Sequence, residues 1–295
     1  MTPAERSIDA LEAAAAQAQR SADYPALERT ARELVARGEA GADRSATAWG
    51  HHYLGVARLR LNDGVGAKRE FERAAELFTE SGDRVAASRS TMNLAMIELS
   101  INVDALAARR LYDAAEPAVR ASGDPLRIAR ALGNLGEIYR LEGDYRAALG
   151  AANEALAIFE RLGEHARAAW QLTNAAHLHA LLRDYPAAME ALRMAYEALA
   201  LEPRERWIAW YVDVCAIIAA KMDRWETAAQ LLGFADRLRD EHTIPRTQVM
   251  LPWLSEPKER MAQLLSDERF DELTREGEGL TLQRAQALVE TLRPA

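Results

Sequence analysis

The sequence predicts an all-α fold in which about six antiparallel helix pairs stack in order and a helical segment caps the C-terminal side. Three observations support this prediction. Residues recur with a period of about 40, apolar residues within each period recur at three- and four-residue steps, and turn-forming residues stand between the apolar stretches. No segment alternates apolar and polar residues for long, so strands are not expected.

The period is clearest in pairs of residues that follow one another at steps of 40, 41 and 40: Leu54-Gly55, Leu94-Ala95, Leu135-Gly136 and Ala175-Ala176. Thirteen residues after the first member of each pair stands an alanine (Ala67, Ala107, Ala148, Ala188), and seven further on another (Ala74, Ala114, Ala155, Ala195). The same step reaches Ala14-Ala15 and Cys215-Ala216. Residues 1–241 are therefore interpreted as six repeats, whose small residues lie where helices touch.

Turn signals separate the predicted helices. Within a repeat, a polar capping residue precedes an aromatic residue or lies beside a glycine, as in Asp23-Tyr24, Asn62-Asp63-Gly64, Gly143-Asp144-Tyr145, Arg183-Asp184-Tyr185 and Asp223-Arg224-Trp225. Between repeats stand Gly82, Gly123 and Gly163, where glycine can adopt the left-handed conformation that ends a helix, and then Pro203. We expect each repeat to contain two helices that begin and end at these signals.

Residues 242–295 break the period. Pro245, Pro252 and Pro257 interrupt the start of this segment, and helical patterns follow at 258–265, 269–276 and 282–292. A terminal repeat without a polar outer face would expose its core. We therefore predict that 242–295 is a capping segment that covers the sixth pair.

The repeats resemble those of the tetratricopeptide repeat family. The fourth unit matches best, with Leu132, Leu135-Gly136, Tyr139, Gly143-Asp144-Tyr145, Ala148 and Ala155 in motif positions. The first and sixth units lack the Leu-Gly pair, and all units are longer than the usual 34 residues. The resemblance implies a right-handed superhelix that binds peptides along a concave wall built from the first helix of each pair.

The C-terminal part resembles the end of the repeat region in bacterial STAND-type ATPase transcription regulators. The similarity rests on Phe270, Glu276-Gly277 and Leu280 to Ala285, together with Ala228 to Gly233. In such regulators the repeats sense or bind a signal, while an ATPase domain and a DNA-binding domain switch transcription. Neither domain is present in this sequence, so a partner ATPase or DNA-binding domain in a longer chain is one interpretation.

Composition and charge exclude several classes of protein. Lys and Arg number 37 against 45 Asp and Glu, and the resulting net charge of -8 is the wrong sign for a surface that neutralises nucleic-acid phosphates. The single cysteine, Cys215, cannot form an intrachain disulfide. The N-terminal stretch is interrupted by charges and no apolar run reaches the roughly 20 residues of a spanning helix. A cytoplasmic protein without membrane or direct nucleic-acid contact is expected, and the resemblance to the STAND-type regulators implies a bacterial one.

The sequence offers no convincing catalytic, cofactor or metal motif. His51-His52, and His177 with His179, are the close histidine groupings, and residues one or two apart on a helix point in different directions. Gly64 to Lys68 lacks the spacing and the preceding strand of a phosphate loop. We expect a non-enzymatic protein with no cofactor and no metal.

The candidate binding residues lie on the first helix of each pair, on the side opposite the Leu and Ala stripe. Asn93, Asn134 and Asn174 immediately precede the small pairs, so their amides recur in register, and an amide offers both a donor and an acceptor to a peptide backbone. The remaining predicted ligand-binding residues are Trp49, Tyr53, Arg89, Arg130, Glu137, Trp170, His177 and Trp210. The arginines favour a ligand with carboxylates, so an acidic peptide is one possibility.

Alternatives remain open for these residues. The asparagines can instead tie neighbouring helices together, the arginines can simply be solvated, and the tryptophans can pack the helix starts rather than flank a ligand. Two functions are weighed: an interaction module that binds a peptide or protein partner in a concave groove, and a signal-sensing region of a STAND-type regulator that binds a small molecule. A deep closed pocket would favour the small molecule, and an open channel the peptide.

Overall fold

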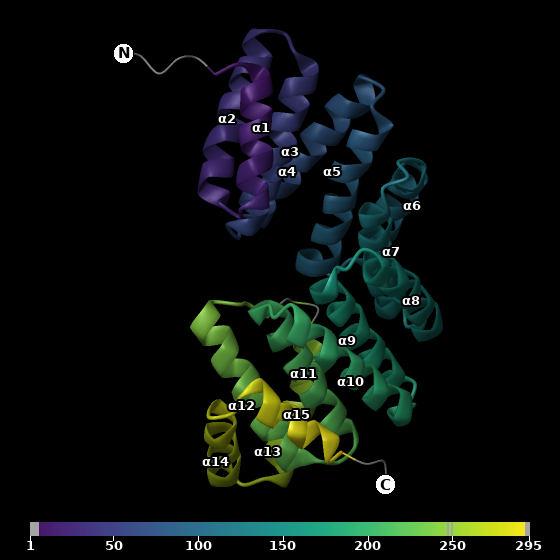
Figure 1. Ribbon diagram of the computed structural model, residues 1–295, viewed down its shortest axis with the longest axis vertical. Helices are drawn as coiled ribbons and strands as arrows, with labels where there is room; N and C mark the ends of the chain where they lie inside the picture. Colours follow the sequence, from purple (N-terminus) through teal and green to yellow (C-terminus); the bar gives the residue numbers. More distant parts are fainter. Residues whose placement is uncertain (1–5, 247, 249, 293–295) are drawn as a thin grey trace. The chain divides into compact units, whose positions relative to one another are not determined.

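A computed structural model describes residues 6–246, 248 and 250–292, which form fifteen α-helices and one short π-helix and contain no strand (Figure 1). The chain divides into two compact units, residues 1–124 and residues 125–295, and each unit is described by itself. The predicted all-α fold built from helix pairs is confirmed.

Unit 1 contains six α-helices and the π-helix η1 (Glu98–Asn102), which follows α5 directly. Each helix packs against the next, and α1 also packs against α3, which is the stacking expected of helix pairs. Leu11, Leu34 and Phe78 are among the fully buried side chains of this unit. The helices are α1 (Ile8–Arg20), α2 (Tyr24–Ala40), α3 (Arg44–Arg60), α4 (Gly64–Glu80), α5 (Arg84–Ile97) and α6 (Ala105–Ala121).

Unit 2 contains three further pairs and three shorter helices. Its helices are α7 (Pro125–Leu141), α8 (Tyr145–Arg161), α9 (His165–Leu181), α10 (Tyr185–Leu201), α11 (Glu205–Lys221), α12 (Trp225–His242), α13 (Leu251–Leu264), α14 (Asp267–Glu278) and α15 (Leu282–Glu290). α9 packs against α8, α10 and α11, whereas α13 and α15 lie against α11 and α12, and α14 lies against α12 (Figure 1). α11 is therefore a central helix of this unit.

The turns follow the capping chemistry of the sequence. Asp23, Asp63, Asp144 and Asp184 each cap a second helix, accepting a hydrogen bond from the backbone N–H three residues later at 3.0, 2.8, 3.0 and 3.2 Å. The inter-repeat glycines Gly82, Gly123 and Gly163 have φ of +78°, +63° and +68°, the left-handed region predicted for them.

The single 41-residue step has a structural cause. η1 adds one residue between the two helices of the third pair, and Val103 after it adopts a left-handed conformation with φ +54°. In α6, which follows η1, the buried positions therefore lie one residue later than the repeat spacing predicts. The predicted contact alanines Ala107 and Ala114 were wrong: Ala108 and Ala115 are buried instead, at 0% and 3% exposure.

Two glycines set the contact between α12 and α14. A Cβ on Gly233 would lie 2.1 Å from the carbonyl oxygen of Thr274, and one on Gly277 would lie 2.0 Å from that of Gln230. Any larger residue would force the two backbones apart. Both glycines belong to the C-terminal pattern noted in the sequence, so their presence there follows from close helix packing.

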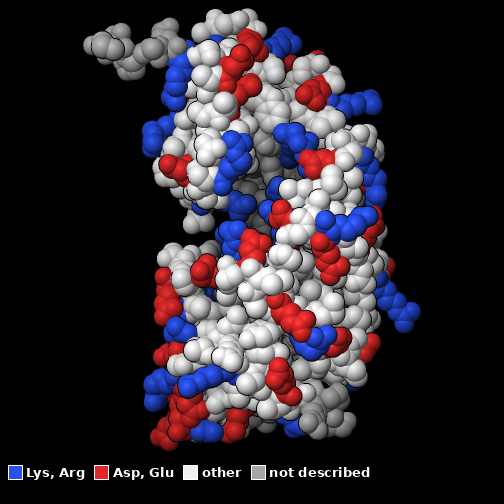
Figure 2. All heavy atoms as spheres, in the orientation of Figure 1, with Lys and Arg blue, Asp and Glu red and all other residues white. Residues whose placement is uncertain are grey.

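Charged side chains of both signs are interspersed where the surface is most polar. The helix α14, at the lower left of the view, carries two Arg among six Asp and Glu (Figure 2). Arg269, for example, binds Glu226 at 3.0 Å and Glu272 at 2.6 Å. Among the described helices, none has the length and apolar character needed to cross a membrane.

Candidate binding wall on the first helices

We use the term first-helix wall for the residues that share three repeat positions on α3, α5, α7, α9 and α11. Successive members of a position are 40 or 41 residues apart. The first position holds Trp49, Arg89, Arg130, Trp170 and Trp210; the second holds Tyr53, Asn93, Asn134, Asn174 and Val214; the third holds Val56, Met96, Glu137, His177 and Ile217. The wall has a part in each unit.

In unit 1 the wall is aromatic and half-buried. The ring of Trp49 lies 5.0 Å from that of Phe78 on α4 and 5.8 Å from that of Tyr53, measured between centroids. The guanidinium carbon of Arg89 lies 4.9 Å from the Trp49 ring centroid, a cation–π contact that joins α5 to α3. Trp49 thus packs the helix start and also keeps part of its surface in solvent.

Tyr53 and Asn93 extend this part of the wall, and both are half-buried. Burial raises the pKa of the Tyr53 phenol, as does the nearby carboxylate of Glu12, while the positive charges of Arg89 and Arg20 act in the opposite direction. The wall of unit 1 therefore presents aromatic surface with both positive and negative groups beside it.

The histidine pair of unit 1 is structural. His51 contacts Glu70 at 2.6 Å, and this hydrogen bond is the main reason why the pKa of Glu70 is lowered. His52 is buried and contacts Ser90 at 2.9 Å, so it joins α3 to α5. The two side chains point to different helices, as predicted. Within the described residues no group of His, Cys, Asp and Glu is arranged to hold a metal ion.

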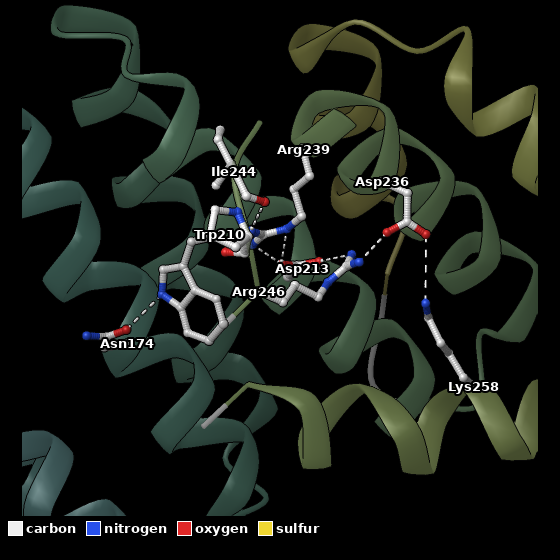
Figure 3. A network of polar contacts seen from close by, with 9 residues as sticks. Asn174, Trp210, Asp213, Asp236, Arg239, Ile244, Arg246 and Lys258 are labelled. Atoms are coloured by element: carbon white, nitrogen blue, oxygen red, sulfur yellow. Dashed lines mark hydrogen bonds and ion pairs between the residues drawn. The ribbon is translucent and has the colours of Figure 1, made fainter. Parts of the chain in front are cut away.

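In unit 2 the wall is more deeply buried. The Nε1–H of Trp210 donates a hydrogen bond of 2.8 Å to Oδ1 of Asn174, which joins α11 to α9 (Figure 3). Trp170 packs against Trp207 with ring centroids 5.4 Å apart. Asn174 therefore joins neighbouring helices, which was the alternative to ligand binding for the asparagines. Trp170 and Trp210 pack between helices.

The other predicted residues of unit 2 differ in exposure. Arg130 is exposed on α7 and Asn134 is half-buried one turn further on. Glu137 binds Arg140 at 2.5 and 3.1 Å. His177 is 1% exposed and Trp210 is 8% exposed. The expectation of an exposed wall holds at Arg130 and is wrong at His177 and Trp210, because the chain beyond α12 covers them.

The covering residue is Trp253 of α13. Its ring centroid lies 3.5 Å from the guanidinium carbon of Arg140, 4.5 Å from the His177 ring and 5.9 Å from the Trp210 ring. Helices α7, α9 and α11 thus each contribute one contact to this indole. Trp253 and Arg140 were not predicted as site residues.

A small cavity of about 10 Å³ lies beside these side chains, room for about one water molecule. Its lining includes His177, Asn174, Gln171 and Trp253. Nε2 of His177 and Nε2 of Gln171 are buried and have no hydrogen-bond partner among the described residues. The cavity is too small for an organic ligand, so it does not favour a small-molecule site at this position.

The His177 imidazole is held neutral. Burial lowers its pKa to about 3, and the positive charges of Arg140 and Lys221 act in the same direction. The imidazole is therefore uncharged near pH 7. In this state it serves as a flat aromatic surface for Trp253.

Asp213 of α11 organises the connection between α12 and α13. It is fully buried and forms ion pairs with Arg239 and, at 2.9 Å, with Arg246 (Figure 3). Arg239 also donates to the carbonyl oxygens of Ile244 and Pro245 at 3.4 and 3.3 Å. The buried carboxylate is compensated by two cations, and the start of the connection is held against α11.

Comparison with known proteins agrees with this architecture. Residues 90–161 and 127–200 match the family model of the tetratricopeptide repeat, which confirms the predicted resemblance. The sequence matches none of the curated proteins.

Among the solved structures that share the fold are the following three. The alignment with BtubC from P. vanneervenii has 21% identity and a TM-score of 0.56, and covers 66% of this chain and 80% of that one. A Rap protein complexed with competence and sporulation factor has 16% identity and a TM-score of 0.63, with 93% and 74% covered. A STAND ATPase with a tetratricopeptide repeat sensor, from Pyrococcus horikoshii, has 17% identity and a TM-score of 0.55, with 90% and 43% covered.

Proposed function

We propose that this tetratricopeptide repeat chain is a non-catalytic interaction module that binds a peptide or protein segment along its first-helix wall. The observation that carries the proposal is the wall of unit 1, where Trp49, Tyr53, Arg89 and Asn93 are half-buried on α3 and α5. Aromatic surface, a guanidinium and an amide at repeat spacing suit a peptide, because they supply apolar contact, charge and backbone hydrogen bonds together.

An acidic segment is the proposed ligand class. Arg89 already rests on the face of Trp49, which holds its planar guanidinium in one orientation. A pre-oriented guanidinium loses little conformational freedom when it binds a carboxylate, and bidentate pairing adds geometric selectivity. In the Rap neighbour the bound molecule is competence and sporulation factor, and that likeness of fold supports ligand binding by this architecture.

A peptide-display experiment tests the proposal. Random peptides are selected on the immobilised chain, and the affinity of the enriched peptides is measured for wild type, Arg89→Glu, Asn93→Ala and the control Arg73→Glu on α4. Arg73 is an exposed residue that pairs with Glu76 in its own helix. We expect enriched acidic peptides whose affinity falls at least about tenfold with Arg89→Glu, equivalent to about 1.4 kcal/mol, and stays unchanged with Arg73→Glu. Equal affinity for wild type and both wall variants would contradict the proposal.

The second candidate function is the sensing region of a larger ATPase regulator. It is favoured by the likeness to the STAND ATPase, in which this chain aligns over 90% of its own length with 43% of that protein. The reading frame around the gene tests it: an ATPase domain and a DNA-binding domain encoded in the same frame would support a sensor, and a frame limited to the repeats would contradict it.

A further inference from the structure

Trp253 occupies the part of the first-helix wall where the repeat positions place ligand contacts. Two of its three ring contacts, His177 and Trp210, are wall residues predicted to bind a ligand, and the third is Arg140 of α7. The indole comes from α13, which lies outside the repeats. The helix α13 of the same chain therefore covers part of the first-helix wall in unit 2.

The surface beneath the indole has unused hydrogen-bonding capacity. Nε2 of His177 and Nε2 of Gln171 are on side chains that are each 1% exposed, and neither atom has a hydrogen-bond partner among the described residues. Buried polar atoms in native proteins are normally paired, because an unpaired one loses its hydration without compensation. The Trp253 ring covers this surface without offering a hydrogen bond to either atom, and the cavity beside the ring borders both side chains.

α13 and α14 are attached to the repeats in different ways. α14 meets α12 backbone to backbone at Gly233 and Gly277, a contact with no room for a Cβ. α13 buries Leu254, Pro257 and Met261, while Leu251 and Leu264 remain 44% and 52% exposed. Its contacts are side-chain contacts, which can open without separating close-packed backbones.

The ion pair made by α13 itself is partly exposed, whereas the connection before α13 is held by the buried carboxylate of Asp213. Arg246, in the connection before α13, pairs with Asp213 and Asp236, and Lys258 of α13 lies 3.8 Å from Asp236 (Figure 3). The Lys258 side chain is 42% exposed and that of Asp236 37%. Exposed ion pairs contribute little to stability. Beyond the anchored connection, the helix α13 itself thus has a weaker hold on unit 2 than α14 has.

We propose that α13 is an internal ligand of the wall, that Trp253 marks an aromatic subsite formed by Arg140, His177 and Trp210, and that a partner peptide bearing a tryptophan enters this subsite by displacing α13. The proposal rests on the proposed function and names the partner chemistry at unit 2. A subsite made of a guanidinium and two aromatic rings binds an indole through cation–π and edge contacts. The polar atoms of His177 and Gln171 are then available to the backbone of the partner.

Tethering makes α13 a strong competitor. A segment joined by a short connection is present at an effective concentration in the millimolar range. The apparent affinity for an external peptide equals the intrinsic affinity multiplied by the fraction of molecules in which the subsite is open. Weakening the internal ligand therefore increases the affinity for an external one.

The test uses a fluorescein-labelled synthetic peptide with the sequence of residues 250–264, titrated by anisotropy into the full-length chain up to millimolar concentration. Wild type, Trp253→Ala, Arg246→Ala and the control Trp207→Ala are compared, with thermal melts of each. We expect Trp253→Ala to bind at least tenfold more tightly than wild type, Arg246→Ala to show a smaller gain, and Trp207→Ala to match wild type. A second peptide with alanine in place of the tryptophan is expected not to bind any of them.

Hydrogen exchange provides an independent measurement that needs no added peptide. Amides of α13 are expected to exchange at least tenfold faster than those of α14, and Trp253→Ala is expected to accelerate α13 alone. If Trp253→Ala and Arg246→Ala bind the peptide no better than wild type, or if α13 and α14 exchange together, the proposal is wrong. This result leaves the proposed function intact, because the wall of unit 1 is tested with different peptides and with Arg89→Glu.

Discussion

The same repeat positions have different surroundings in the two units. Trp49 of unit 1 is half-buried under Arg89, whereas Trp210 of unit 2 is 8% exposed and hydrogen-bonded to Asn174. The third position is half-buried Val56 in one unit and fully buried His177 in the other. Repeat register alone therefore does not decide whether a wall residue is accessible; the segment that follows the repeats decides it.

The largest effect is expected from deleting residues 254–295, which removes α14, α15 and all of α13 after Trp253. Leu254, Met261, Leu273 and Val289 are each at most 3% exposed, and burying a side chain of this kind contributes about 1.5–3 kcal/mol. We expect unit 2 to lose on the order of 5 kcal/mol of unfolding free energy or more, seen as a lower melting temperature and solubility.

Unit 1 supplies the control for this deletion. None of residues 254–295 belongs to unit 1, so amide exchange in α1–α5 is expected to stay as in the full chain. An unchanged melting temperature for the whole chain would show that residues 254–295 are an independent appendage rather than a cap.

The next effect is expected from Asp213→Asn, which breaks the anchor between α11 and the start of the connection to α13. Arg239 is 6% exposed, and removing its carboxylate partner leaves a buried cation uncompensated, at a cost of about 3–5 kcal/mol. Urea denaturation measures the loss. The matched change Asp236→Asn affects a carboxylate that is 37% exposed and is expected to cost about 1 kcal/mol or less. Equal costs for the two variants would show that Asp213 is not an anchor.

A smaller effect is expected from pH through His177. Its pKa is about 3 in the folded chain and 6.5 for an ordinary histidine, so between these values the unfolded chain binds the proton and the folded chain does not. The neutral, buried imidazole therefore makes its full contribution to the unfolding free energy above pH 6.5, and this contribution is lost as the pH falls toward 3. The unfolding free energy of wild type should fall by about 2 kcal/mol more than that of His177→Asn between pH 7 and pH 5. Parallel pH profiles would mean that His177 is accessible to protons, and hence that Trp253 does not cover it.

Much of the fold was predictable because its signals are local. The capping aspartates Asp23, Asp63, Asp144 and Asp184 act within three residues of their own position, and the inter-repeat glycines act through their own φ angles. The failure at Ala107 and Ala114 is also local in origin, because one π-helical turn before them moves the buried positions to Ala108 and Ala115. The 41-residue step in the sequence shows that one residue has been added, but it does not show that the added residue lies in the π-helical turn η1.

One signal for the covered wall was present in the sequence. Every residue of α11 from Ala209 to Ala220 is buried, and Val214 to Ala220 is apolar on all sides of the helix. A helix that is apolar all round is buried all round, so the first helix of the sixth pair had to be covered on the side where the other first helices carry polar residues. Which residue covers it was not indicated, since Trp253 is one aromatic in a charged segment.

The sequence by itself thus determined the helix pairs, their boundaries and the candidate wall, because spacing and capping depend on residues a few positions apart. Only the tertiary structure decided which part of the wall is covered. The contacts of Trp253 with Arg140, the ion pair of Asp213 with Arg246 and the contact of Gly233 with Thr274 join residues that are 33 to 113 positions apart. Such contacts depend on how whole helices dock, and the burial of His177 and its lowered pKa follow from that docking.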